Sequence, residues 1–285
     1  MIPFPLVYYC PETIEEATLL YRQLRTDGMR PLYYGGGTEI LTLARLNQVD
    51  AGSLIDLKGI PEMTQIIAND DTIGFGAGLT LIQIAQDDSW PLLTATVDRI
   101  ADHTSRSKIT LGGNLGSTLP YREACLPFLL ADSWVEVASP NGVEKRPFTA
   151  VFEGQLSLAP GEFLLRLWVN RDETHHLFAS WKMTRFDWID YPLVTVAAIR
   201  EGPHTKMALT GYGKAPMRLK TLDPIFSNSS QTAGERARIA VAQLAAAGID
   251  DLHGSAAYRQ FVLQNTLTDI IQQLEESSDA RPNPN

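Results

Sequence analysis

Cysteine is scarce in this chain, since its 285 residues include only Cys10 and Cys125. Two cysteines cannot form a disulfide framework, and this small number fits a reducing compartment. They also cannot hold an iron–sulfur cluster, which normally needs four cysteine ligands. The five histidines show no spacing typical of a metal site. We therefore expect a cytoplasmic protein that binds no metal through this chain.

Long apolar runs and excess positive charge are also absent. No stretch approaches the roughly 18 consecutive apolar residues that a membrane span needs. The N-terminus lacks a basic region and becomes acidic at Glu12, which argues against a signal peptide. The net charge is −9, which disfavours nucleic acid as a partner. We expect neither a membrane nor a nucleic acid as the main partner.

Glycine is gathered in two stretches that lack a following lysine. Residues 33–41 read YYGGGTEIL, and residues 109–117 read ITLGGNLGS. Neither matches a nucleoside-triphosphate loop, which requires a lysine and a hydroxyl residue after its last glycine. The backbone N–H groups of such turns still bind anions, especially beside a helix N-terminus. Two turns that hold one pyrophosphate from opposite sides would indicate a dinucleotide cofactor, and a side chain at Gly36 or Gly113 would fill the space it needs.

The order of predicted elements indicates an α+β fold. A strand at Arg30–Tyr34, the first glycine turn, a helix within 39–47 and a strand at Ser53–Leu57 predict a small parallel sheet. Residues 64–68 and 72–76 predict a hairpin, and Thr80 with Gln83 predicts a capped helix start. The later part predicts an antiparallel sheet and two helices. Its strands are 162–169, 176–183, 193–200 and 206–213, and its helices are 234–247 and 256–276.

Both glycine stretches match motifs of one family. YGGGTEIL resembles the A-G-G-T-[DE]-[LI] turn, and TLGGNL resembles the T-[IL]-G-G-N-[IL] turn, of the FAD-binding subunits of molybdenum hydroxylases. This family includes the flavin subunit of xanthine dehydrogenase and the medium subunit of aerobic carbon monoxide dehydrogenase. SLIDLKGIPEM, TIGFGAGLTLIQIA, YPLVTVAAI and AYRQFVLQNTL have counterparts in the same order. The resemblance covers nearly the whole chain, residues 3–270.

The resemblance implies a domain organisation. An FAD-binding domain would span residues 1–172, built from two α/β subdomains at 1–57 and 58–172. A C-terminal domain of antiparallel sheet plus helices would span 173–276. The remaining residues, 277–285, read SSDARPNPN, which is a composition typical of a disordered tail.

The resemblance also implies a function. The chain would be a flavoprotein oxidoreductase subunit with one FAD. A partner iron–sulfur subunit, fed by a molybdenum cofactor subunit, would deliver electrons that pass from FAD to NAD⁺ or another acceptor. The complex would be a dimer of heterotrimers.

The resemblance further places the cofactor on twelve residues and assigns no catalytic residue. Tyr34 is a thirteenth candidate, because it precedes the first turn and would pack against the adenine or flavin, with packing in the strand core as the alternative. Glu123 takes the place of a family aspartate, with an ordinary charge in the first turn of a helix as the alternative. Lys182 takes the place of a family lysine, with a solvated strand lysine as the alternative. The cofactor-binding residues are Tyr34, Gly35, Gly36, Gly37, Thr38, Glu39, Thr110, Leu111, Gly112, Gly113, Asn114, Glu123 and Lys182.

Two other interpretations compete with this one. GFGAGL at 74–79 is close to the Rossmann fingerprint, although its third glycine comes one place too early. It would support a flavin-free oxidoreductase that uses a nicotinamide cofactor. Alternatively, the chain would be an assembly subunit without a cofactor, which two nearly complete glycine turns argue against.

Overall fold

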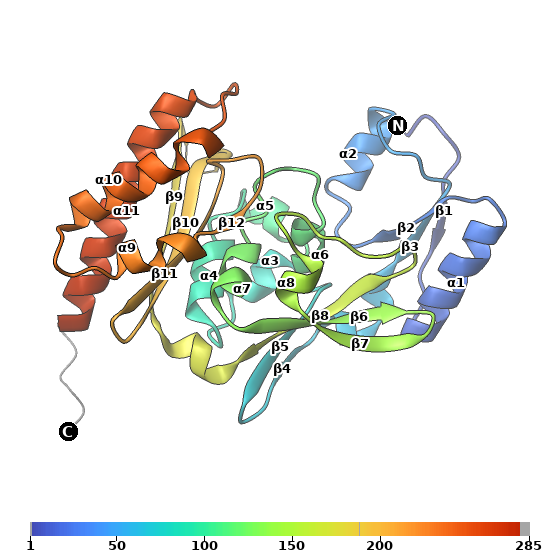
Figure 1. Cartoon of the computed structure of the whole chain (residues 1–285). Helices are drawn as coiled ribbons and strands as arrows, with labels where there is room; N and C mark the ends of the chain where they lie inside the picture. The colour runs from blue at the N-terminus through green and yellow to red at the C-terminus, as the bar shows by residue number, and fades with distance from the viewer. Residues whose placement is uncertain (1, 188, 280–285) are drawn as a thin grey trace. The chain divides into compact units, whose positions relative to one another are not determined.

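The computed structural model describes residues 2–187 and 189–279, which form two compact units (Figure 1). The first unit comprises 2–86, 103–117 and 133–171. The second comprises 87–102, 118–132 and the described residues from 172 onward. Two segments inside the predicted 1–172 domain thus fold with the second unit. The α+β fold class is confirmed, because the described residues form one parallel and two antiparallel sheets together with helices.

The parallel sheet begins the first unit. Its strand order is β1-β3-β2, and both pairings are parallel. Parallel strands need crossover connections, which two helices supply here. The predicted strand–turn–helix–strand unit is therefore confirmed. The elements are β1 (Val7–Tyr9), α1 (Ile14–Thr26), β2 (Pro31–Tyr34), α2 (Ile40–Arg45) and β3 (Ser53–Asp56).

A five-stranded antiparallel sheet completes the first unit, in the order β4-β5-β8-β6-β7. The predicted hairpin is confirmed as β4 and β5. The strand predicted at 162–169 for the C-terminal sheet is wrong in its partner, because β8 pairs with β5 and β6 here. Of the first seven residues of β8, nearly all are buried. The strand therefore lacks the alternation of buried and exposed residues that would indicate which sheet it joins. The strands are β4 (Ile66–Ala68), β5 (Thr72–Gly76), β6 (Ser133–Ser139), β7 (Gly142–Pro147) and β8 (Phe163–Asn170).

Short helices connect the strands of the first unit. The Thr80 hydroxyl accepts the N–H of Gln83, and the Gln83 side chain accepts the N–H of Thr80, so the predicted capping box is confirmed. The helices are α3 (Leu81–Ala85), α5 (His103–Arg106), α6 (Leu111–Leu115) and α8 (Phe148–Val151), with single turns at η1 (Leu57–Gly59) and η2 (Pro61–Thr64).

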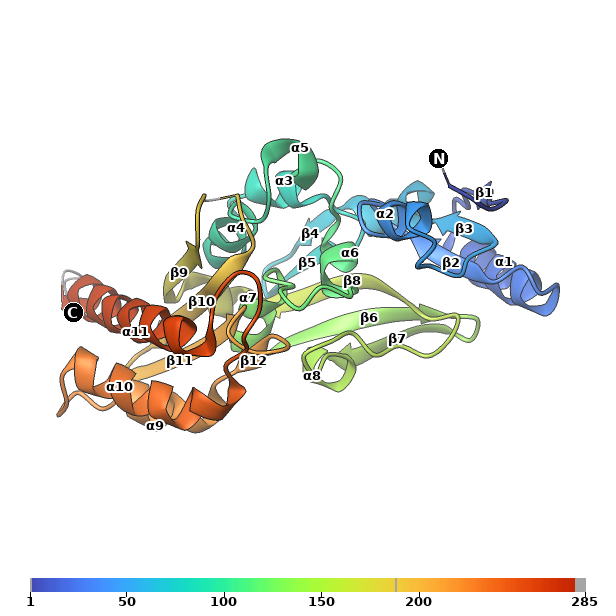
Figure 2. The same cartoon turned by 90° about the horizontal axis from the view of Figure 1, so that it is seen from above.

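The second unit is built around a four-stranded antiparallel sheet in the order β12-β11-β10-β9. Helices α9, α10 and α11 cover one face, and α4 and α7 lie on the other (Figures 1 and 2). The elements are α4 (Pro91–Val97), α7 (Cys125–Leu130), η3 (Arg171–His175), β9 (Leu177–Thr184), β10 (Pro192–Glu201), β11 (His204–Thr210), β12 (Met217–Arg218), η4 (Lys220–Leu222), α9 (Asp223–Phe226), α10 (Ala233–Leu244), η5 (Ala245–Ala247) and α11 (Ala256–Asp279).

Two neighbouring residues of β9 show how the sheet meets both helix layers. Successive side chains of a strand point to opposite faces. The Trp181 indole N–H donates to Gln273 of α11 at 2.8 Å. The Lys182 ammonium donates to the carbonyl of Arg99, just after α4, at 2.9 Å.

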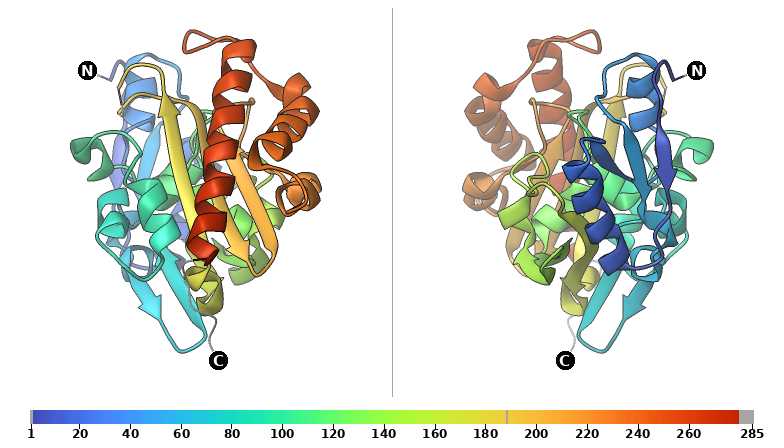
Figure 3. Two further views of the ribbon diagram at one scale, coloured as in Figure 1. Left: turned by 90° about the vertical axis from the view of Figure 1, so that its left-hand side faces the viewer. Right: turned by 90° about the vertical axis from the view of Figure 1, so that its right-hand side faces the viewer.

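Helix α11 is the longest element and crosses the sheet of the second unit (Figure 3, left). Its buried side chains, among them Leu263, Leu267 and Ile270, join those of β10 and β11 in one hydrophobic core. The helix continues through Asp279, so residues 277–279 of the predicted tail are helical. Residues 280–285 lie outside the described part of the chain.

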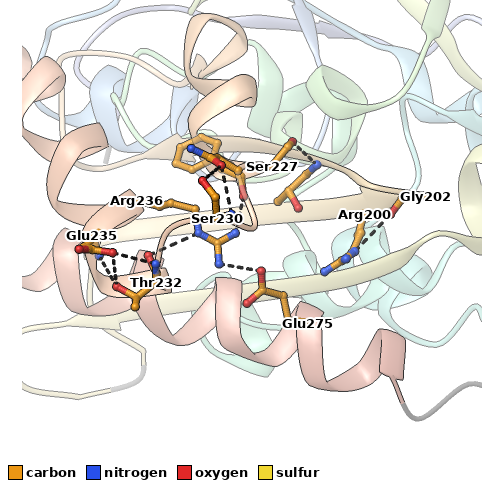
Figure 4. A network of polar contacts seen from close by, with 11 residues as sticks. Arg200, Gly202, Ser227, Ser230, Thr232, Glu235, Arg236 and Glu275 are labelled. Carbon is orange, nitrogen blue, oxygen red and sulfur yellow. Dashed lines mark hydrogen bonds and ion pairs between the residues drawn. The ribbon is translucent and has the colours of Figure 1, made fainter.

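Two buried arginines hold the helices of the second unit in place. Arg236 of α10 donates to the carbonyl of Phe226 at 2.9 Å and to the carboxylate of Glu275 at 2.6 Å, in the network that Figure 4 shows. Arg259 of α11 is fully buried. It donates to the carbonyls of Leu193 and Gly211, each at 2.6 Å. It also pairs with Asp251 at 2.6 Å.

We expect Arg259→Met to destabilise the protein by about 2–6 kcal/mol, because the carbonyls of Leu193 and Gly211 lose their buried donor and each unsatisfied group costs about 1–3 kcal/mol. Urea unfolding followed by tryptophan fluorescence checks this value. Arg238→Met is the matched control, because Arg238 is exposed on α10. Its effect should stay within about 0.5 kcal/mol. Equal effects of the two substitutions would contradict the role given to Arg259.

Candidate functional site

The first glycine turn, residues 35–39, leaves the carboxyl end of β2 and leads into α2. Gly37 has a φ of 73°, in the left-handed region that favours glycine. The carbonyl of Gly37 accepts the N–H of Leu41 at 3.0 Å. Within residues 2–187 and 189–279, the N–H groups of Gly36, Gly37 and Thr38 donate to no protein acceptor. Three consecutive amides are thus available to an external acceptor.

The two tyrosines before this turn have different surroundings. Tyr33 stacks on Tyr21, with ring centres 4.9 Å apart, and donates to the carbonyl of Gly161 at 3.0 Å. Tyr34 lies against the turn itself, since a Cβ placed on Gly37 would be 2.1 Å from the Tyr34 hydroxyl. Burial raises the pKa of Tyr34, with the negative charge of Asp56 as a further cause. The structure therefore brings Tyr34, and not Tyr33, to the glycine turn.

The structure also brings the two glycine stretches together. A Cβ on Gly36 would lie 1.6 Å from the carbonyl oxygen of Lys108. A Cβ on Gly35 would lie 2.6 Å from the hydroxyl of Thr110. The expectation that a side chain at Gly36 would enter ligand space is therefore wrong, because protein backbone already occupies that space. Gly36 is needed for the two main chains to approach each other, and Gly35 leaves room for the Thr110 side chain.

The second turn uses its own amides internally. Thr110 caps α6 by accepting the N–H of Gly113 at 3.1 Å and, through its carbonyl, that of Asn114 at 2.8 Å. The N–H of Leu111 donates to Leu79 at 2.8 Å, and that of Gly112 to Ala77 at 2.7 Å. The two turns therefore differ: the amides of 111–114 have protein acceptors, whereas those of 36–38 have none in the described chain.

Side chains join the two turns as well. The hydroxyl of Ser117, just after α6, donates to the carboxylate of Glu39. Thr38 is exposed, and its carbonyl accepts the hydroxyl of Thr42 at 2.9 Å. Gly113 is exposed too, but a Cβ there would lie 2.8 Å from the Thr110 hydroxyl, so a side chain at Gly113 would also meet protein first.

The stretch close to a Rossmann fingerprint has another role. Gly74 lies in β5 of an antiparallel sheet, not between parallel strands. The N–H groups of Gly76, Ala77 and Gly78 donate to carbonyls of Gln65, Leu165 and Met63. No amide there is available to a pyrophosphate, so the only sequence support for a flavin-free nicotinamide enzyme is lost.

Sequence reasoning missed two contributors to this site. The first is the pair of carbonyls at Ala77 and Leu79 that anchor the second turn, for which only the adjacent glycines gave a signal. The second is Lys58, whose ammonium donates to the carbonyl of Gly35 at 2.7 Å. Its signal is its place in SLIDLK, immediately after β3 and thus at the edge of the sheet that the first turn leaves.

Glu123 and Lys182 both belong to the second unit, where their charged groups lie 3.7 Å apart. The Lys182 side chain is only 4% exposed, so the solvated alternative is wrong. Glu123 is buried and precedes α7, so the alternative of an ordinary charge in that helix is also wrong. Burial raises the pKa of Glu123, and Lys182 opposes the rise. Contact of either residue with a cofactor stays a prediction.

Across 2–187 and 189–279, no three or more His, Cys, Asp or Glu side chains converge in a way that could hold a metal ion. In the same ranges, no helix has the combined length and apolar character needed to cross a membrane.

Comparisons with known proteins agree on one family. The model of the family described as "FAD binding domain in molybdopterin dehydrogenase" matches residues 3–169. The carbon monoxide dehydrogenase medium chain of Hydrogenophaga pseudoflava is 26% identical over 276 residues, covering 91% of this chain and 93% of that protein. The nicotine 6-hydroxylase medium subunit of Paenarthrobacter nicotinovorans is 26% identical over 277 residues, covering 93% and 95%.

Solved structures share the fold. A chain of the Cu,Mo-CO dehydrogenase in its cyanide-inactivated form aligns with a TM-score of 0.85 at 22% identity, over 97% of this chain and 99% of that chain. A chain of quinoline 2-oxidoreductase from Pseudomonas putida 86 aligns with a TM-score of 0.82 at 21% identity, over the same shares. The resemblance predicted from the two glycine stretches is confirmed.

We expect Gly36→Ala to destabilise the first unit by about 3 kcal/mol, at the upper end for overpacking, because the new methyl group would collide with the Lys108 carbonyl. Thermal and urea unfolding check this. Gly234→Ala is the matched control, since a Cβ there meets nothing within 4 Å. It should stabilise the protein by about 0.4–1 kcal/mol. A Gly36→Ala protein as stable as the wild type would contradict the packing.

We expect Lys182→Met to destabilise the protein by about 3–5 kcal/mol at neutral pH, because Glu123 loses its cation. The ordinary Glu pKa is 4.5, and the folded pKa lies above it. Without Lys182, which opposes the rise, the folded pKa of Glu123 goes higher still in the variant. A raised folded pKa means that stability falls as pH rises from the unfolded to the folded value, so the variant loses more stability than the wild type. The deficit against wild type should therefore be smaller at roughly pH 5 than at roughly pH 7.

Urea unfolding at both pH values measures this dependence. Lys214→Met is the control, because Lys214 is exposed and should show no deficit. A deficit of Lys182→Met that is independent of pH would contradict the pairing with Glu123.

Proposed function

We propose that this chain, which belongs to the family of FAD binding domains in molybdopterin dehydrogenase, is an electron-transfer subunit. The chain is the FAD-binding subunit of a molybdenum hydroxylase-type dehydrogenase, and thus a flavoprotein oxidoreductase. It binds one FAD and takes electrons from a partner iron–sulfur subunit.

A single observation carries the proposal: the amides of Gly36, Gly37 and Thr38 have no acceptor in the described chain. Backbone amides in a row form a concave donor site that suits phosphate oxygens without a lysine. The residues present therefore fit the pyrophosphate of FAD. In this proposal Gly36–Thr38 bind the pyrophosphate, Thr38 adds its exposed hydroxyl, and Tyr34 and Glu39 border the same turn.

The second turn has a different part in the proposal. Thr110 and the Lys108 carbonyl lie against Gly35 and Gly36, so they fix the first turn on the side where Cβ atoms would lie. Leu111 and Gly112 anchor α6 through their amides. Gly113 and Asn114 then supply the part of the second turn that borders the cofactor, because Gly113 is exposed and carries no side chain.

The electron path follows from what this chain lacks. Bound FAD would supply one-electron and two-electron transfer, and the protein would position the cofactor and tune its electrostatic environment. Two cysteines cannot hold an iron–sulfur cluster, so the electrons reach FAD from a partner iron–sulfur subunit. That subunit in turn receives them from a molybdenum cofactor subunit. The electrons leave to NAD⁺ or another acceptor. The proposed assembly is a dimer of heterotrimers in the cytoplasm.

Reconstitution of the purified chain with FAD tests the proposal. We expect yellow protein with one FAD per chain after gel filtration, because the first turn presents three amides to the pyrophosphate. Flavin absorbance against protein concentration gives the stoichiometry. Riboflavin, which lacks the pyrophosphate, should bind much more weakly.

Each alternative predicts a different result. A colourless protein that binds NADH but not FAD would favour the flavin-free oxidoreductase. A folded protein that binds neither would favour an assembly subunit. Co-purification of iron–sulfur and molybdenum polypeptides with the tagged chain tests the partners, and reoxidation of the reduced flavin by NAD⁺ tests the acceptor.

A further inference from the structure

A cluster of charged and aromatic side chains lies at the carboxyl edge of the parallel sheet. Lys58 follows β3, and its ammonium donates to the carbonyl of Gly35 at 2.7 Å. The same ammonium lies 2.7 and 2.8 Å from the two carboxylate oxygens of Asp56. It also lies 4.5 Å from the ring centre of Tyr34. The cation is thus held on several sides beside the first glycine turn.

The carboxylate of Asp56 is itself fixed. It accepts the hydroxyl of Tyr8 from β1 and the backbone N–H of Lys58 at 2.9 Å. Its side chain is 6% exposed, which keeps water from competing for these bonds. The cluster therefore links β1, β3 and the turn after β2.

The ammonium donates to Gly35 and to Asp56, whose two oxygens lie close enough together to share one N–H. The Lys58 side chain is also 36% exposed, so its charge is open to a phosphate directly. A second influence on a ligand passes through the Gly35 carbonyl.

That carbonyl belongs to the same rigid unit as an unpaired amide. The C=O of Gly35 and the N–H of Gly36 are parts of one planar trans peptide and point in opposite directions. Glycine flanks this peptide on both sides, so no Cβ of its own restricts the backbone angles that set its direction. A hydrogen bond to the carbonyl also polarises the peptide and strengthens its N–H as a donor.

We infer that Lys58 is a positioning residue for the cofactor: by holding the Gly35 carbonyl, it points the Gly36 N–H toward the pyrophosphate. This inference rests on the proposed function of the first turn. Asp56 and Tyr8 serve Lys58 by fixing where its ammonium lies.

Lys58→Met removes the hydrogen bond and retains much of the side-chain volume. We expect FAD to bind about 10–100-fold more weakly, the range for a hydrogen bond to a charged group. Fluorescence titration of the purified chain measures the dissociation constant. The unfolding midpoint should fall, because the buried Asp56 carboxylate loses its cation. Riboflavin affinity of the folded variant should change little, which separates positioning of the pyrophosphate from general loss of structure.

Asp56→Asn distinguishes positioning from simple charge attraction. Through positioning, the substitution releases one anchor of Lys58 and weakens FAD binding. Through charge alone, it adds net positive charge beside the turn and strengthens binding. Asp50→Asn is the matched control, because Asp50 pairs with Arg30 at the surface of the same unit and should leave FAD affinity unchanged.

The outcomes are distinct. Weaker FAD binding in Lys58→Met and Asp56→Asn, with unchanged binding in Asp50→Asn, would support the inference. Unchanged affinity in Lys58→Met, or tighter binding in Asp56→Asn, would overturn it while the proposed function stands. A wild-type protein that takes up no FAD would overturn both.

Discussion

The contact between the main chain at Gly36 and the carbonyl of Lys108 is the constraint on which the site depends. A Cβ at Gly36 would fall 1.6 Å from that oxygen, so only glycine permits the approach. The contact joins a turn of the parallel sheet to the segment that leads into α6, more than seventy positions away in the chain. It places the first turn against protein on one side and leaves three of its amides without a protein acceptor in the described residues.

The two glycine stretches look alike in sequence but differ in their hydrogen bonds. Leu111 and Gly112 donate to carbonyls just after β5, and Thr110 caps its own helix. Backbone amides at a helix start are an anion site only where the chain supplies no acceptor of its own. The second stretch therefore packs against the first and stabilises it, while its own amides are paired. The similar motifs do not reveal this difference.

Local signals predicted much of the fold. The parallel unit around the first turn, the hairpin β4–β5 and the Thr80 capping box all depend on residues a few positions apart, and all are confirmed. The partner of β8 was not predictable, because an almost wholly buried strand carries no alternation that marks its sheet. The burial of Lys182 was missed for a similar reason, since its surroundings come from α4 and from Glu123, both distant in sequence.

Among the cations that hold backbone carbonyls, Lys182 and Arg236 have buried side chains, whereas that of Lys58 is exposed. The N–H of each peptide shows how the role inferred for Lys58 differs from a purely structural one. Lys182 holds the Arg99 carbonyl, and the N–H of the same peptide, on Ile100, donates to Val97 at 3.1 Å. Arg236 holds the Phe226 carbonyl, and the corresponding N–H donates to Asp223 at 3.0 Å.

In both of those cases the protein satisfies both ends of the peptide, so holding the carbonyl directs no unpaired amide toward a ligand. At Gly35 the carbonyl is held by Lys58, while the N–H that follows has no acceptor in the described chain. An unpaired buried or half-buried amide is unfavourable unless a partner arrives. In this peptide the carbonyl has a protein partner and the N–H has none among the described residues, and this difference favours a ligand as the partner of the Gly36 N–H.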